Sequence, residues 1–272
     1  MNPTKCLFLF LMALLVVRPF DALAQDFEVA PVDIEFTSEP GESDYRTVLI
    51  TNHSNKKVSF LLGMADFLTA EDGSSIEKPA GSTDRSCVNW LTASPMYFDL
   101  NPNDSKEVMV SIIVPKGDFS TRWARLYVKT TEEQTAFSAD KNLAAGVILS
   151  PRITIRVIQS PKSNNFFAGK ITGIKEIQKD NPEAPGNRYF NATVKNTGDK
   201  VNKCKVFLLL TNIETEAETR YPPLVFNLYP GAQKIVELAM PSGVPPGKYA
   251  VSAILDYGHG NLEGTQMVID IQ

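Results

Sequence analysis

The stretch Leu143-Ala-Ala-Gly-Val-Ile-Leu-Ser-Pro-Arg-Ile-Thr-Ile-Arg-Val-Ile-Gln159 holds the longest sustained strand pattern in the sequence. After Pro151 branched aliphatic residues alternate with polar ones, and successive side chains of a strand point to opposite faces. Ile153, Ile155 and Val157 fall on one face, and Arg152, Thr154 and Arg156 fall on the other. The pattern predicts a strand with one buried face.

A second alternation precedes Pro151 and contains Gly146. Proline and glycine weaken the interior of a sheet and are found at its edges. A long apolar edge strand exposes unpaired backbone groups and invites pairing with another chain. We therefore expect this segment either to bind a partner or to be an ordinary core-facing strand end. Its alternating positions are Leu143, Ala145, Val147 and Leu149.

Short strand patterns separated by turn residues fill the rest of the chain on both sides of this stretch. Each half fits about seven strands and contains no convincing helical pattern, which is typical of a sandwich. The predicted fold class is therefore all-β, with two tandem β-sandwich domains. A concave surface between two such domains is a natural binding site. The expected boundaries are 25–160 for the first domain, 161–166 for a short linker and 167–272 for the second domain.

Residues 1–24 have the three parts of a cleaved signal peptide: a positive start, a short apolar run and the small-residue site Ala22-Leu-Ala24. No later run is long and apolar enough to span a bilayer. Without the signal, which holds Lys5, Arg18 and Asp21, the formal charge is 25 − 30 = −5. The mild acidity and the lack of a basic cluster argue against nucleic acid as the partner. We expect a soluble protein in an extracytoplasmic space.

The sequence contains no motif of a known catalytic site, so we predict a non-enzymatic protein with no catalytic residue, no cofactor and no metal. Asp256, His259 and Glu263 form a possible metal-ligand set in one hairpin, but a plain turn explains them as well. The two cysteines after the signal, Cys87 and Cys204, are expected to be buried free thiols rather than an interdomain disulfide. The two tryptophans, Trp90 and Trp123, are expected in a sandwich core rather than in a sugar-binding surface.

The order of motifs in residues 27–160 resembles the N-terminal immunoglobulin-like domain of periplasmic pilus-assembly chaperones. The motifs are a strand, an Asn-rich turn, a strand, and then Asn89-Trp-Leu91, Phe98-Asp-Leu-Asn-Pro102, Arg122-Trp-Ala-Arg-Leu-Tyr127 and the long last strand. Residues 167–272 look like fibronectin-type adhesion modules, through Val194-Lys-Asn-Thr-Gly198 and Pro245-Pro-Gly-Lys-Tyr249. The resemblance implies two immunoglobulin-like domains in the periplasm or at the cell surface.

The resemblance also implies a binding mechanism, in which the last strand of the first domain completes the sheet of a partner polypeptide. Leu143, Val147 and Leu149 would be the donor side chains, with the small Ala145 between them. In the family, a basic pair on the first and last strands grips the terminal carboxylate of the partner. Arg152 would be the last-strand member, whereas the first strand, Phe27–Phe36, carries no Arg or Lys.

The leading hypothesis is chaperone-like capture of a secreted or surface polypeptide, such as a fimbrial-type subunit. The alternative is a cell-surface adhesion or scaffold module that contacts wall glycan or another envelope protein through its loops and interdomain groove. The oligomeric state is left open by the sequence.

Overall fold

The computed structural model describes residues 26–131 and 151–272. The described residues form β-strands and one short 3-10 turn at Val88–Trp90, so the predicted all-β fold class is confirmed. Among them there is no helix with the length and apolar character needed to cross a membrane. The predicted signal sequence and the positions Leu143, Ala145, Val147 and Leu149 lie outside the described residues.

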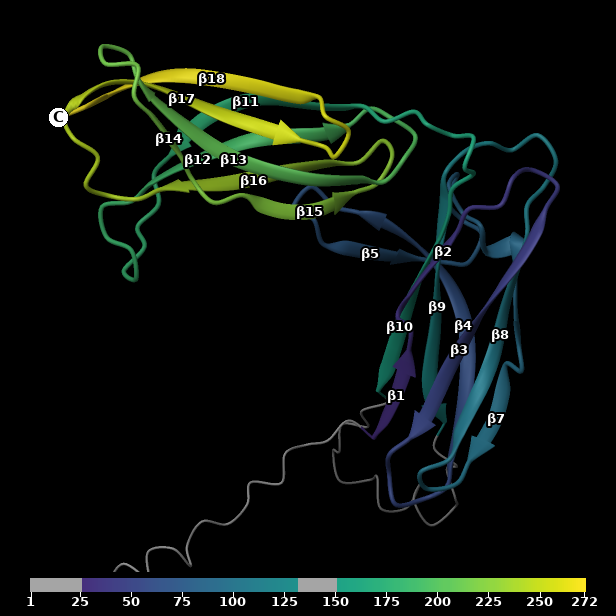
Figure 1. Cartoon of the computed structure of the whole chain (residues 1–272). Helices are drawn as coiled ribbons and strands as arrows, with labels where there is room; N and C mark the ends of the chain where they lie inside the picture. The colour runs from purple at the N-terminus through teal and green to yellow at the C-terminus, as the bar shows by residue number, and fades with distance from the viewer. Residues whose placement is uncertain (1–25, 132–150) are drawn as a thin grey trace, which may run out of the picture.

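The N-terminal sandwich is built from strands β1 to β10, which form two facing sheets (Figure 1). Across the first sheet the order is β1 (Phe27–Ala30), β3 (Ser43–Asn52), β8 (Ser105–Ile113) and β6 (Leu91–Ser94). Across the second sheet it is β2 (Asp33–Phe36), β10 (Arg152–Gln159), β9 (Arg122–Thr131), β4 (Val58–Thr69) and β5 (Ser75–Lys78), with β7 (Tyr97–Leu100) also paired to β4.

The core of this sandwich follows the alternation that the sequence predicts. Ile155 and Val157 are fully buried in it, and Ile153 packs against it. From β9 the core receives Ala124, Leu126 and Val128, while Arg125 and Tyr127 face outward. One apolar face on each strand is therefore what holds the two sheets together.

The C-terminal sandwich is built from strands β11 to β18 and has its own core. One sheet has the order β11 (Gly169–Ile177), β12 (Arg188–Asn196) and β16 (Gln233–Met240). The other has the order β14 (Glu218–Arg220), β13 (Asn202–Asn212), β17 (Gly247–Asp256) and β18 (Leu262–Ile271), with β15 (Leu224–Leu228) also paired to β13. The two tandem immunoglobulin-like sandwiches predicted from the sequence are thus present.

The two sandwiches meet at one end of each, and the molecule is bent at the junction (Figure 1). An aromatic cluster fills the junction: the ring of Tyr229 lies 4.9 Å from Trp123 and 5.2 Å from Phe67, between centroids. Ile158, at the end of β10, completes the cluster. Trp123 is therefore buried, as predicted, but between the sandwiches rather than inside one. Trp90 packs, partly buried, against the N-terminal core.

Polar contacts reinforce the junction. The carboxylate of Asp199 accepts hydrogen bonds from the Arg85 guanidinium, from the backbone N–H of Thr121 at 3.2 Å and from the side-chain amide of Asn164 at 2.6 Å. These groups come from both sandwiches and from the connection between them. Bonds to an ionised acceptor are stronger than neutral ones, so the network stabilises one relative placement of the sandwiches.

The hairpin of β4 and β5 is a third link, since it extends from the N-terminal sandwich to the C-terminal one (Figure 1). At its tip the carbonyl of Glu71 accepts a 2.9 Å hydrogen bond from the backbone N–H of Ile235 on β16. The Gln233 side chain also donates to the Glu71 carboxylate. The tip therefore covers part of the outer edge of β16, which would otherwise be an open sheet edge.

Candidate functional site

One side of the N-terminal sandwich is open, because its first two strands lie in different sheets. β1 pairs with β3 in the first sheet, and after two residues the chain enters the second sheet as β2. β2 runs parallel to β10 and pairs only with its second half, Arg156–Gln159. β9, by contrast, pairs with β10 over its whole length. Among residues 26–131 and 151–272, the backbone of 152–155 therefore has a strand neighbour on one side only, and we call this stretch the open edge.

The backbone groups at the open edge can be assigned from the register. The N–H of Arg156 donates to the carbonyl of Val32 at 2.9 Å, so the backbone of Arg156 faces the β2 side. Because backbone groups alternate in direction along a strand, the N–H and C=O of Thr154 and Arg152 face the same side. These four groups are placed to pair with an added strand.

The open edge adjoins the segment from which the sequence predicts partner binding. Leu143, Ala145, Val147 and Leu149 lie outside the described residues, so their role as donor side chains stays a prediction. They have the same parity as Ile155 and Val157, which face the core. An uninterrupted strand would therefore carry them on the core-facing side.

The side chain of Arg152, the residue predicted to bind the carboxylate of a partner, contacts other residues of this protein. Its guanidinium lies 4.9 Å from the centre of the Tyr127 ring and donates two hydrogen bonds to the Glu77 carboxylate, at 2.6 and 3.1 Å. The bonds from Arg152 hold the pKa of Glu77 below its usual value and raise the pKa of Arg152 itself. Gly63 makes this arrangement possible, because a Cβ there would lie 2.3 Å from the Tyr127 ring.

Arg156 is the arginine of β10 that faces the junction between the sandwiches. It lines a cleft of about 570 Å³ that we call the arginine cleft. Its guanidinium forms a 2.7 Å ion pair with Asp33 of β2. The other charged or aromatic lining residues include Arg125, Lys234, Phe67 and Tyr229. The first strand thus contributes the carboxylate of Asp33 to this cleft. The additional cations are Arg125 from β9 and Lys234 from β16.

Two of these lining residues are held by the junction itself. The Arg125 guanidinium lies 4.5 Å from the Phe67 ring centre, and the Lys234 ammonium lies 4.7 Å from that of Phe226. Burial raises the pKa of the Tyr229 hydroxyl, and the nearby positive charge of Arg156 acts in the opposite direction. The cleft is therefore cationic and bounded by aromatic side chains.

Arg152 is the carboxylate-binding residue predicted from the sequence, and Arg156, which lines the arginine cleft, is not among the predicted site residues. Both residues lie on the outer face of β10, so alternation alone does not distinguish them. The signal that separates them is distance along the chain from the predicted linker. Arg156 is four residues closer to the predicted linker than Arg152 is, so it lies nearer the second sandwich.

The possible metal ligands of the hairpin and the two cysteines have structural roles. Asp256 accepts a hydrogen bond from the Gly258 N–H at 2.9 Å, and the His259 ring stacks on Phe167. In residues 26–131 and 151–272 no three His, Cys, Asp or Glu side chains gather as a metal site, so the proposed hairpin ligand set is not brought together. Cys87 and Cys204 are free and lie in separate cores, where burial raises the pKa of each thiol to about 12.

Comparisons with known proteins identify the fold. No family model and no curated protein sequence matches the chain. A chain in the solved chaperone–tip adhesin complex of CFA/I fimbriae biogenesis is 12% identical, with a TM-score of 0.50; the match covers 90% of this chain and 98% of that one. The class 5 fimbriae chaperone CfaA is also 12% identical, with a TM-score of 0.47 over 89% and 98% of the two chains. The E. coli chaperone DraB is 14% identical, with a TM-score of 0.40 over 90% and 98%. The match with a TM-score of 0.50 shows that the protein has the immunoglobulin-like fold of pilus-assembly chaperones, as the sequence resemblance implies.

Proposed function

We propose that this protein is a non-enzymatic, chaperone-like binding protein of the bacterial periplasm that captures a secreted or surface polypeptide by β-strand addition. The observation that carries the proposal is the half-paired strand β10, whose open edge presents unpaired backbone groups directly after the apolar segment 143–149. A sheet edge of this kind is a template for another strand.

In the proposed complex a strand of the client lies along the open edge and continues beside residues 143–150. Main-chain hydrogen bonds with Arg152 and Thr154 supply affinity that does not depend on the client sequence. Leu143, Val147 and Leu149 fill a gap in the client's core, and the small Ala145 accommodates a bulky client residue. Burying three such side chains contributes roughly 1.5–3 kcal/mol each before ordering costs are subtracted.

The arginine cleft gives the bound strand a fixed end. A client chain running along the open edge toward the junction arrives beside Arg156, which lies only two residues beyond Thr154. A carboxylate there would compete with Asp33 for the Arg156 guanidinium and would also meet the charge of Arg125 or Lys234. We assign this anchoring role to Arg156 in place of Arg152, because Arg152 is held by two hydrogen bonds to Glu77, whereas Arg156 lines a cleft that also contains the cations Arg125 and Lys234.

Similar structures support a polypeptide client in the envelope. The solved complex with a TM-score of 0.50 contains a chaperone and a tip adhesin. A fimbrial-type subunit is accordingly the client class that we propose, and the same analogy supports the periplasmic location and the absence of catalysis.

The test is a crosslinking pull-down from the native envelope with tagged protein beginning at Gln25, scored by mass spectrometry for polypeptides and by sugar analysis for glycan. We expect one stoichiometric secreted polypeptide. Leu149→Asp should abolish its recovery, whereas Ile148→Asp should not, because in a strand residue 148 has the opposite parity to the donor positions.

Both variants must retain the unfolding midpoint of the parent for the comparison to count. A folded Leu149→Asp protein that still recovers the client would contradict strand addition. Leu149→Asp protein that is unfolded would show that Leu149 is an ordinary core residue. Recovery of glycan without a polypeptide would favour the scaffold hypothesis instead.

A further inference from the structure

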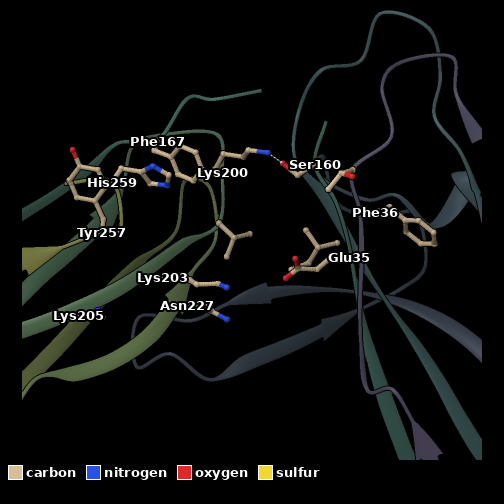
Figure 2. Close-up of a pocket in the computed structure, with 14 residues that line it drawn as sticks. Glu35, Phe36, Ser160, Phe167, Lys200, Lys203, Lys205, Asn227, Tyr257 and His259 are labelled. Atoms are coloured by element: carbon tan, nitrogen blue, oxygen red, sulfur yellow. Dashed lines mark hydrogen bonds between the residues drawn. The ribbon is translucent and has the colours of Figure 1, made fainter. Parts of the chain in front are cut away.

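A second hollow lies between the two sandwiches and is lined by lysines. We call it the lysine groove; its volume is about 500 Å³. One wall is formed by β13 and the adjoining part of β15, and the other by β2 and the end of β10 (Figure 2). The charged and amide side chains that line it include Glu35, Lys200, Lys203, Lys205 and Asn227.

Lys203 and Lys205 give the groove its charge. They are two residues apart on β13, so both side chains are on the outer face while Cys204 between them is buried in the core. Both lysines are exposed, and within the described residues neither side chain forms an ion pair or hydrogen bond. Asn227 lies directly opposite Lys203 in the β13–β15 pairing and adds an amide to the same wall.

Lys200 is committed to the junction instead. Its ammonium donates to the Ser160 hydroxyl at 2.8 Å and to the Pro161 carbonyl at 3.0 Å. Burial lowers its pKa, and Glu35 is among the carboxylates that act in the opposite direction. Figure 2 shows Lys203 and Asn227 pointing toward Glu35 across the groove. Lys203 and Lys205 are thus the cations available to a ligand, and Glu35 is the acidic group on the facing wall.

The spacing of the two lysines indicates the shape of the ligand. Two residues along a strand span roughly 6.6 Å. An extended peptide presents its residues i and i+2 on one face at the same spacing, so a peptide with acidic residues at these two positions matches the lysine pair in charge and in distance. The floor of the groove is apolar, because Ile158, Val201 and Phe167 line it, and it can accept an apolar neighbour of the acidic pair.

We propose that the lysine groove binds an extended peptide segment carrying an acidic-x-acidic motif. A peptide fits the concave, mixed-polarity groove between two sandwiches better than an anionic membrane does, because the chain as a whole has a net charge of −4 and would be repelled from a negative surface. The groove is lined by other residues than the open edge, so this binding is independent of strand capture.

The test uses a pool of N-acetylated, C-amidated nonapeptides with Glu fixed at positions 4 and 6 and the other positions varied. The pool is retained on immobilised protein beginning at Gln25 and compared with a pool that has Gln at the two positions. We expect enrichment of the Glu pool. For an enriched peptide, the double variant Lys203→Gln, Lys205→Gln should weaken binding at least about fivefold, and raised salt should weaken binding to the parent.

Two control variants make the result specific. Lys170→Gln with Lys195→Gln removes the same charge from a cross-strand pair on the opposite sheet, and it should leave affinity within about twofold. Glu35→Gln should strengthen binding, because it removes a carboxylate from the facing wall. Leu149→Asp should have no effect, which separates failure of this proposal from failure of strand capture.

Equal retention of the Glu and Gln pools, or equal weakening by the two lysine double variants, would overturn the proposal. Vesicles of phosphatidylglycerol and phosphatidylcholine provide the remaining comparison. Binding to these vesicles that depends on Lys203 and Lys205, without retention of the Glu pool, would show that the groove contacts a membrane and would likewise overturn the peptide assignment.

Discussion

Two sheet edges near the junction differ in whether their outer backbone groups are covered by another part of the chain. The edge of β16 in the C-terminal sandwich is covered, since the carbonyl of Glu71 in the β4–β5 hairpin accepts a hydrogen bond from the N–H of Ile235. The first half of β10 in the N-terminal sandwich, at 152–155, has no strand neighbour on the β2 side within the part of the chain that the structure describes. Uncovered edges promote unwanted pairing. A chain that covers one edge with a dedicated hairpin and leaves the other open has the open one available for binding.

The largest effect on this comparison is expected from Trp123→Ala, because Trp123 holds the junction on which both edges depend. The substitution removes the contacts with Phe67 and Tyr229 and the hydrogen bond from the indole N–H to the Phe67 carbonyl. We expect a loss of about 3–5 kcal/mol in the free energy of unfolding, measured with denaturant. Phe119→Ala, at a site where the ring is 56% exposed, is the control and should cost less than about 0.5 kcal/mol.

Asp199→Ala should have the next largest effect, about 2–3 kcal/mol. The change removes the shared acceptor of Arg85, Thr121 and Asn164 and leaves a partly buried guanidinium without its carboxylate. Chemical unfolding measures the loss, and small-angle X-ray scattering should show a broader distribution of shapes. Asp180→Ala, in an exposed loop, should change neither; an equal loss there would mean that the effect is one of net charge.

Gly73→Ala tests the covered edge directly and should cost about 1–2 kcal/mol. Gly73 has a φ of +84°, and an added Cβ would lie 2.5 Å from the Lys234 ammonium. The hairpin tip should therefore loosen, and hydrogen exchange of the Ile235 amide should accelerate toward that of Thr154 at the open edge. Gly117→Ala is a matched control, because it has a φ of +83° and no atom within 4 Å of the added Cβ. It should cost similar stability and leave Ile235 protected.

The smallest effect is expected from Glu77→Gln, which releases Arg152 beside the open edge. Glu77 has a pKa lowered by the hydrogen bonds from Arg152, so its stabilising contribution is present above the unfolded-state pKa and is lost as pH falls through the folded-state pKa. Because both side chains are more than a third exposed, we expect a loss below about 1 kcal/mol at pH 7. The difference between variant and parent should vanish at acidic pH in urea unfolding. A difference that grows on acidification would contradict this assignment.

The sequence predicted the features that depend on strand alternation. Ile155 and Val157 are in the core, and their neighbours on β10 face outward, as periodicity requires. Cys87 and Cys204 are free and buried as expected. These properties are local, because a strand with one apolar face buries that face whatever lies opposite.

Properties that depend on the placement of one sandwich against the other were not predictable in this way. Trp123 shares a face with Arg125 and Tyr127, outside its own core, and its burial includes the packing of Tyr229 from the second sandwich. Within the first sandwich, the pairing of Arg152 with Glu77, 75 residues away in sequence, likewise depends on the arrangement of the strands and not on alternation. The arginine cleft and the lysine groove are made from both sandwiches, so alternation within a strand gives no information about them.

The length of β4 has a mechanical consequence. β4 contains 12 residues, which corresponds to roughly 40 Å of extended chain. It pairs with β9 inside the N-terminal sandwich, and its hairpin is fastened to β16 of the C-terminal sandwich. β4 and its hairpin thus connect the two sandwiches mechanically. Tension on a polypeptide held at the open edge would therefore pass from β10 by two routes, along the chain into the segment that follows β10 and sideways through β9 into β4.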